Sequence, residues 1–155
     1  MRKAMFSLAA VFAVALASYA VAADEAQQAK ATIGKEAPAF SLQDQDGKTV
    51  NLSDFKGKTV VLEWFNQGCP YVVRHYKAKT MIDTAAKYKD KDVVWLAINT
   101  TAGKTADDNK ASAESWGINY PILSDTSSSV AQAYGAKSTP HMFVIDKEGL
   151  SLIHI

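Results

Sequence analysis

The chain has 155 residues, a formal net charge of +1, and a composition that is 48% hydrophobic and 21% charged. These values predict one globular domain with a sizeable core. The basic residues are scattered singly, so the charge pattern indicates neither a nucleic-acid partner nor a membrane-surface partner.

The first 23 residues have the three parts of a secretory signal peptide. Arg2 and Lys3 form a positive start, residues 4–17 are apolar, and Ala20 and Ala22 supply the small-residue pattern of a cleavage site. We therefore expect a periplasmic or secreted protein without stable membrane insertion after cleavage. An uncleaved membrane anchor is the alternative, but the apolar run is shorter than the roughly 20 residues that a span needs.

Residues 24–36 are polar and are expected to form a flexible leader, followed by one domain over residues 37–155. Short strands are predicted near 40–42 and 50–52, and one helical turn over 53–57 with Ser53 as a possible N-cap. The longer predicted elements are strands at 58–66, 92–100, 120–125 and 141–146, helices at 70–90, 105–116 and 127–136, and a final apolar segment at 150–155. This alternation predicts an α/β fold with helices on both faces of a sheet.

Cys69 is the only cysteine, and it lies in the stretch WFNQGCPYVVRHY. An exported chain with one cysteine cannot form an internal disulfide, so the thiol is buried and inert, paired with another molecule, or reactive. Cys69 falls between a predicted strand end and a predicted helix start, where unpaired N–H groups and the helix dipole stabilise a thiolate. Pro70 suits the first helical position. We favour a reactive thiol with a lowered pKa.

Glu63 lies six residues before Cys69, inside the apolar strand. Burial of a carboxylate is costly, and desolvation raises its pKa, so Glu63 is a candidate proton acceptor beneath the thiol. The alternatives are a solvated strand end or pairing with a lysine.

Two long segments carry a resemblance to a known family. The stretches IGKEAPAFSLQDQDGKTVNLSDFKGKTVVLEWFNQGCPYV and SDTSSSVAQAYGAKSTPHMFVIDKEG resemble the redoxins of the thioredoxin-like superfamily, which include alkyl hydroperoxide reductase and thiol-specific antioxidant relatives. The resemblance implies a thioredoxin-like fold, a mixed sheet of four or five strands flanked by helices. It also implies that Thr139–Pro140 is cis and faces the cysteine. The candidate catalytic residues are Cys69, Glu63, Thr139 and Pro140, with Trp64, Asn66, Pro70 and Arg74 expected in their vicinity.

The chain departs from the family pattern around the thiol. If Cys69 is the first cysteine of a C-x-x-C motif, the second would stand at Val72, and if it is the second, the first would stand at Asn66. The pair is broken in either register. Typical peroxiredoxins place Thr or Ser where Asn66 stands, and they use an arginine near the thiolate. Arg74 is five residues after Cys69 and therefore not on the same helix face. A solvated helix residue is the alternative for Arg74.

The family also continues beyond the last predicted strand with a hairpin strand and a long C-terminal helix. Here the sequence ends at Ile155. We expect a truncated or frame-shifted end that lacks the C-terminal helix and leaves apolar surface exposed.

These observations favour an exported redoxin whose single thiolate attacks a peroxide or a disulfide and is resolved by an external thiol reductant or a partner protein's thiol. The main alternative is a non-catalytic thioredoxin-fold binding module with a vestigial or intermolecularly paired cysteine. A metal carrier is the third hypothesis, but three scattered histidines and one cysteine do not indicate a metal site. We expect neither a metal nor another cofactor.

Overall fold

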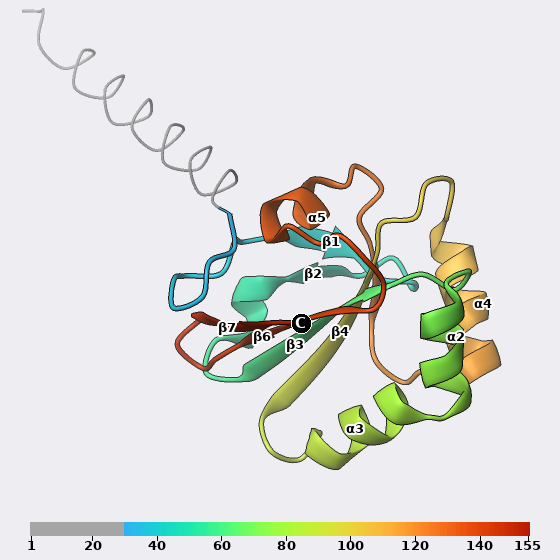
Figure 1. Cartoon of the computed structure of the whole chain (residues 1–155), viewed down its shortest axis with the longest axis horizontal. Coiled ribbons are helices and arrows are strands. Elements are labelled where there is room, and N and C mark those ends of the chain that lie inside the picture. The colour runs from blue at the N-terminus through green and yellow to red at the C-terminus, as the bar shows by residue number, and fades with distance from the viewer. Residues whose placement is uncertain (1–29) are drawn as a thin grey trace, which may run out of the picture.

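The structure, a computed structural model, describes residues 30–155 (Figure 1). The predicted signal peptide and the first part of the predicted leader lie outside the described residues. Contacts with the domain begin at Ala31 rather than at residue 37, because Ala31 N–H donates to Ala133 O at 2.8 Å and Gly34 N–H to Ser151 O at 2.7 Å. Within residues 30–155, no helix is long and apolar enough to cross a membrane.

A mixed sheet of seven strands forms the centre of the domain, in the order β2-β1-β5-β4-β3-β6-β7. The strands are β1 (Ser41–Gln43), β2 (Thr49–Asn51), β3 (Thr59–Phe65), β4 (Val93–Asn99), β5 (Ile122–Ser124), β6 (His141–Ile145) and β7 (Ser151–His154). β3 pairs with β4 in parallel and with β6 in antiparallel orientation. β1 and β2 extend the sheet beyond the four or five strands that the family resemblance implies.

Helices cover both faces of this sheet (Figure 1). They are the 3₁₀ helix η1 (Leu52–Phe55) and the α-helices α2 (Pro70–Lys77), α3 (Thr80–Tyr88), α4 (Ala106–Trp116) and α5 (Ser129–Tyr134). Residues of α5 pack with Trp64 and Phe143 on one face, whereas residues of α2, α3 and α4 pack with Phe65 on the other. This division follows from β3, whose consecutive side chains point to opposite faces. The α/β prediction is thus confirmed.

The single helix predicted over residues 70–90 is wrong, because the chain forms two helices there. Lys79 separates them with a left-handed backbone, at φ 56° and ψ 15°. α2 closes with Ala78 N–H donating to Arg74 O and Lys79 N–H donating to Tyr76 O, both at 3.0 Å. Neither glycine nor proline marks this break. The sequence pattern therefore predicts one continuous helix where the chain forms two.

The predicted N-cap Ser53 is also wrong. Asn51 precedes η1 instead, and its backbone N–H donates to the Asp54 carboxylate at 2.9 Å. A carboxylate is well placed at this end of a helix, since the first N–H groups have no partner inside the helix.

Strand β7 is the last element of the described chain and lies at the edge of the sheet. Apolar side chains are exposed there, as the sequence predicts: Leu152 is 43%, Ile153 43% and Ile155 76% exposed.

We predict that Lys79→Gly stabilises the domain by about 1 kcal/mol, because glycine adopts the left-handed conformation without a Cβ clash. Urea denaturation measures the free energy of unfolding. Lys77→Gly is the matched control, since it places glycine in regular helix and should destabilise by up to about 1 kcal/mol. Equal destabilisation by both substitutions would contradict the assigned helix break.

Candidate functional site

A tight turn between β3 and α2 places Cys69. Asn66 shapes this turn: its side-chain Oδ1 accepts from Gly68 N–H at 2.7 Å and its carbonyl accepts from Cys69 N–H at 3.0 Å. A Cβ on Gly68 would lie 3.2 Å from Asn66 Oδ1, so glycine permits the close approach. Cys69 becomes the N-cap of α2, and Pro70 is its first residue. The predicted junction is therefore present.

The Cys69 thiol is half-buried and faces the loop before β6. Its S–H donates to the carbonyl oxygen of Thr139 at 3.1 Å. The pKa of the thiol is lowered by the side-chain hydrogen bond with Thr139, and then by the backbone N–H groups of Val72 and Tyr71, while burial opposes the shift. These donors favour the thiolate, as the start of a helix is expected to do.

The loop that carries Thr139 is held beside the end of β3. Its Thr139–Pro140 peptide bond is cis, as the family resemblance implies. The next residue, His141, pairs with Trp64 across β6 and β3. His141 Nδ1 accepts from Lys137 N–H at 3.3 Å. Burial, and then the charges of His154 and Lys137, lower the pKa of His141, so the neutral ring keeps its acceptor nitrogen.

Glu63 is fully buried in β3 and surrounded by polar aromatic side chains. Its carboxylate accepts from Trp95 Nε1–H at 2.9 Å and from the Tyr76 hydroxyl at 3.1 Å. Burial raises its pKa to about 7, and hydrogen bonds from Trp95, Tyr76 and Tyr120 oppose the rise. A carboxyl group with this pKa gains and loses a proton near neutral pH.

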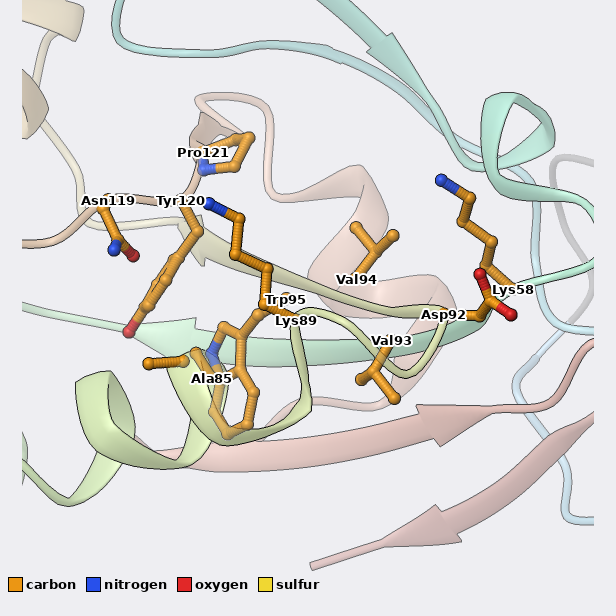
Figure 2. Close-up of a pocket in the computed structure, with 11 residues that line it drawn as sticks. Lys58, Ala85, Lys89, Asp92, Val93, Val94, Trp95, Asn119, Tyr120 and Pro121 are labelled. Carbon is orange, nitrogen blue, oxygen red and sulfur yellow. The ribbon is translucent and has the colours of Figure 1, made fainter.

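The two tyrosines beside Glu63 form a hydroxyl chain. Tyr76 and Tyr120 hydroxyls are 2.8 Å apart. Burial, followed by the charge of Glu63, raises the pKa of both, so both hydroxyls stay protonated. Tyr120 and Trp95 also line a surface cavity of about 330 Å³ between α3 and the start of β4 (Figure 2). Trp95 and Tyr120, which form hydrogen bonds with Glu63, therefore also line a cavity that is open to solvent.

Glu63 and Cys69 lie under the same helix. Cys69, Val72 and Tyr76 occupy consecutive turns of α2, and all three pack into the hydrophobic cluster that contains Phe65. Within residues 30–155 no hydrogen bond joins Glu63 directly to the cysteine. Tyr76 therefore links the buried acid to the helix whose start holds the thiol.

The remaining predicted residues have different surroundings. Trp64 is buried on the opposite face of β3, against Tyr134 and Phe143, with ring centroids 5.4 and 5.0 Å away. Arg74 is exposed and has no ion pair within residues 30–155, which fits the solvated alternative. Val72 is fully buried, and neither it nor Asn66 supplies a second thiol.

Sequence reasoning missed Tyr76, Trp95 and Tyr120, which hold the buried acid. A buried carboxylate calls for nearby donors, and aromatic residues with polar tips were the only available signal. It also missed an amide chain in which Asn99 Nδ2 donates to Gln67 Oε1 at 3.1 Å and Asn109 Oδ1 at 2.7 Å. Among the described residues, no group of three or more His, Cys, Asp or Glu side chains could hold a metal.

Comparison with known sequences gives a family match over most of the chain. Residues 33–150 match the AhpC/TSA family. The chain is 34% identical over 123 residues to thiol-disulfide oxidoreductase ResA of Bacillus subtilis, covering 75% of this chain and 63% of that protein. It is 33% identical over 132 residues to the chloroplastic peroxiredoxin Q of Triticum aestivum, covering 78% of this chain and 57% of that protein.

Comparison with solved structures identifies the fold. The thioredoxin domain of a thiol-disulfide oxidoreductase from Bacteroides vulgatus superposes with a TM-score of 0.69 at 25% identity, covering 79% of this chain and 87% of that one. The domain therefore has a thioredoxin-like fold.

We predict that Glu63 makes the stability of the protein depend on pH. Between the ordinary pKa of 4.5 and the folded value of about 7, Glu63 is protonated in the folded chain but ionised in the unfolded chain. The free energy of unfolding should therefore fall as pH rises through this window, by about 3 kcal/mol in total.

Urea denaturation across this pH range measures the fall, which Glu63→Gln should abolish. Glu114→Gln, at an exposed position on α4, is the matched control and should keep the wild-type dependence. Parallel pH curves for the wild type and Glu63→Gln would contradict the raised pKa.

Proposed function

Because the chain belongs to the AhpC/TSA family and holds its one thiol at a helix start, we propose that it is a thiol–disulfide oxidoreductase acting through Cys69 alone. The observation that carries this proposal is the half-buried thiol, with its lowered pKa, against Thr139. The names of its Bacillus subtilis and Bacteroides vulgatus relatives support the same chemistry. The chain spans 63% of the Bacillus subtilis relative, less than two thirds of its length, so the activity and substrates of this chain are part of the proposal.

In the proposed reaction the Cys69 thiolate attacks one sulfur of an external disulfide. A mixed disulfide forms on Cys69, and the other sulfur leaves as a thiolate that takes up a proton. A second external thiolate then attacks the mixed disulfide, which restores the Cys69 thiolate and releases a new external disulfide. No second cysteine is required, in keeping with Val72 and Asn66 at the positions of the missing partner.

The surrounding residues have assigned roles in this proposal. Thr139 contacts the thiol, and its side chain stabilises the thiolate, while Pro140 follows it in the same loop across the cis bond. Glu63 is the proton acceptor beneath the site, because a carboxyl group with a pKa of about 7 exchanges protons at neutral pH.

Reduction of peroxides is the second candidate, favoured by the 33% identity to peroxiredoxin Q. There the thiolate would become a sulfenic acid and be resolved by an external thiol. Two features favour disulfide exchange instead. Asn66 stands where typical peroxiredoxins have Thr or Ser, and the side chain of Arg74 is exposed on α2.

We propose further that the chain is exported and works in the periplasm or outside the cell. The support is the signal-peptide pattern of residues 1–23. Mass spectrometry of the periplasmic fraction should find a chain that begins near residue 23. A full-length chain found in the cytoplasm would contradict export.

The proposed reaction predicts that Cys69 exchanges with a small disulfide several-fold faster than free cysteine at neutral pH, because more of it is thiolate. Stopped-flow kinetics with bis(hydroxyethyl) disulfide measures the rate, and Cys69→Ser supplies the blank. The pH profile should show an inflection near pH 7 that Glu63→Gln removes. The control Glu114→Gln should keep the inflection.

The outcome separates the candidates. A Cys69 that reacts with disulfides no faster than free cysteine, but rapidly with hydrogen peroxide, would favour the peroxidase. A thiol that is slow with both would favour the non-catalytic binding module.

A further inference from the structure

A second cavity lies beside the thiol, on the face of the sheet that α5 covers. Its volume is about 330 Å³, and it is lined by Trp64, Phe65, Asn66, Thr100, Thr101, Ala131, Ala136, Lys137, Ser138 and Thr139. Thr139 connects the cavity with the thiol. It lines the cavity, and its carbonyl oxygen lies 3.1 Å from Cys69 Sγ. A small molecule in this cavity is therefore separated from the sulfur by one residue.

One residue of the lining, Trp64, carries a buried N–H without a partner among the described residues. Trp64 is only 2% exposed, yet its Nε1–H has no acceptor within residues 30–155. An unpartnered buried donor is unusual and costs free energy, typically about 1–3 kcal/mol. This N–H lies beneath the cavity surface, so the accessible donors come from other residues of the lining.

Two other donors are available. Asn66 uses its side-chain oxygen on Gly68, and its NH₂ group donates no hydrogen bond within the described part of the chain. Lys137 is exposed, and its ammonium group forms no ion pair there, although its backbone N–H is held by His141. The lining contains no acidic side chain. The cavity thus offers donors and one positive charge.

We propose that this cavity binds the carboxylate-bearing tail of a small thiol or disulfide whose sulfur exchanges with Cys69. A carboxylate only accepts hydrogen bonds, and it complements both the ammonium group of Lys137 and the NH₂ group of Asn66. The volume suits a small organic ligand. This inference rests on the proposed function and names the substrate class of that same site.

The exchange step requires no further oxidant, because one S–S bond breaks as another forms. The thiolate of Cys69 attacks one sulfur of the anionic disulfide, the S–S bond of the ligand breaks, and an S–S bond to Cys69 forms. The released half leaves as a thiolate and takes a proton from solvent. The half that stays keeps its carboxylate in the cavity, next to Lys137.

The test compares two small disulfides, dithiodipropionate, which is anionic, and bis(hydroxyethyl) disulfide, which is neutral. Mass spectrometry of quenched samples gives the rate of mixed-disulfide formation on Cys69. Lys137→Ala should slow the anionic probe about two- to fivefold more than the neutral probe, the range of an exposed ion pair. Lys137→Glu should slow the anionic probe further.

Lys87→Ala is the matched control, because it removes one exposed positive charge from α3, outside the cavity. It should leave both rates unchanged. Propionate, which has no sulfur, should compete with dithiodipropionate and not with the neutral disulfide.

Each outcome has a separate meaning. If Lys137→Ala and Lys87→Ala slow the anionic probe equally, only net charge matters, and the cavity is excluded as the carboxylate site while the proposed function stands. If wild-type Cys69 reacts with neither disulfide faster than free cysteine, the proposed function itself fails. Selective loss with the Lys137 variants supports the assigned site.

Discussion

The contact between Cys69 and Thr139 is the interaction on which the site depends, because the hydrogen bond with the Thr139 side chain lowers the pKa of the thiol. It joins residues 70 positions apart in the sequence, and Cys69 Sγ lies 3.1 Å from the Thr139 carbonyl oxygen. The contact forms only because β6 lies antiparallel to β3 and brings the loop before His141 beside the end of that strand. The Asn66 turn then directs the chain into α2 with the thiol at its start. Strand pairing and one turn together create the setting in which the thiolate is stabilised.

The buried acid imposes a second constraint on the same helix. An ionised carboxylate without water is costly, so Glu63 requires donors from several elements. Trp95 on β4 and Tyr76 on α2 provide them, which ties the position of α2 to the protonation of Glu63. The raised pKa shows that these donors only partly offset burial. Burial of Glu63 therefore lowers the stability of the protein, and it does so at a residue that can exchange a proton at neutral pH.

The order of apolar and polar residues along the chain was sufficient to predict the features that neighbouring residues determine. The continuous apolar run predicted β3, and the polar turn followed by Pro70 predicted the N-terminal position of Cys69. The partners of Glu63 could not be predicted, because Trp95 and Tyr120 reach it from strands and loops distant in the sequence. The break at Lys79 was missed because a lysine adopts a backbone that usually marks glycine.

The cavity beside Thr139 was invisible to sequence reasoning for the same physical reason. Its lining comes from β3, the segment after β4, α5 and the loop before Pro140, which only the folded sheet brings together. The unpartnered N–H of Trp64 is a property of that packing. A chain with one cysteine cannot form an internal disulfide, and we propose this cavity as the place where an external partner binds.

The pKa of the Cys69 thiol tests the central claim most directly. Thiolate absorbance in the ultraviolet, followed as pH is raised in the folded protein, measures it in a chain with one thiol, with Cys69→Ser as the blank. We expect a pKa below that of a free cysteine thiol, and a higher one in Thr139→Val. A pKa at or above the ordinary value, unchanged by Thr139→Val, would contradict it.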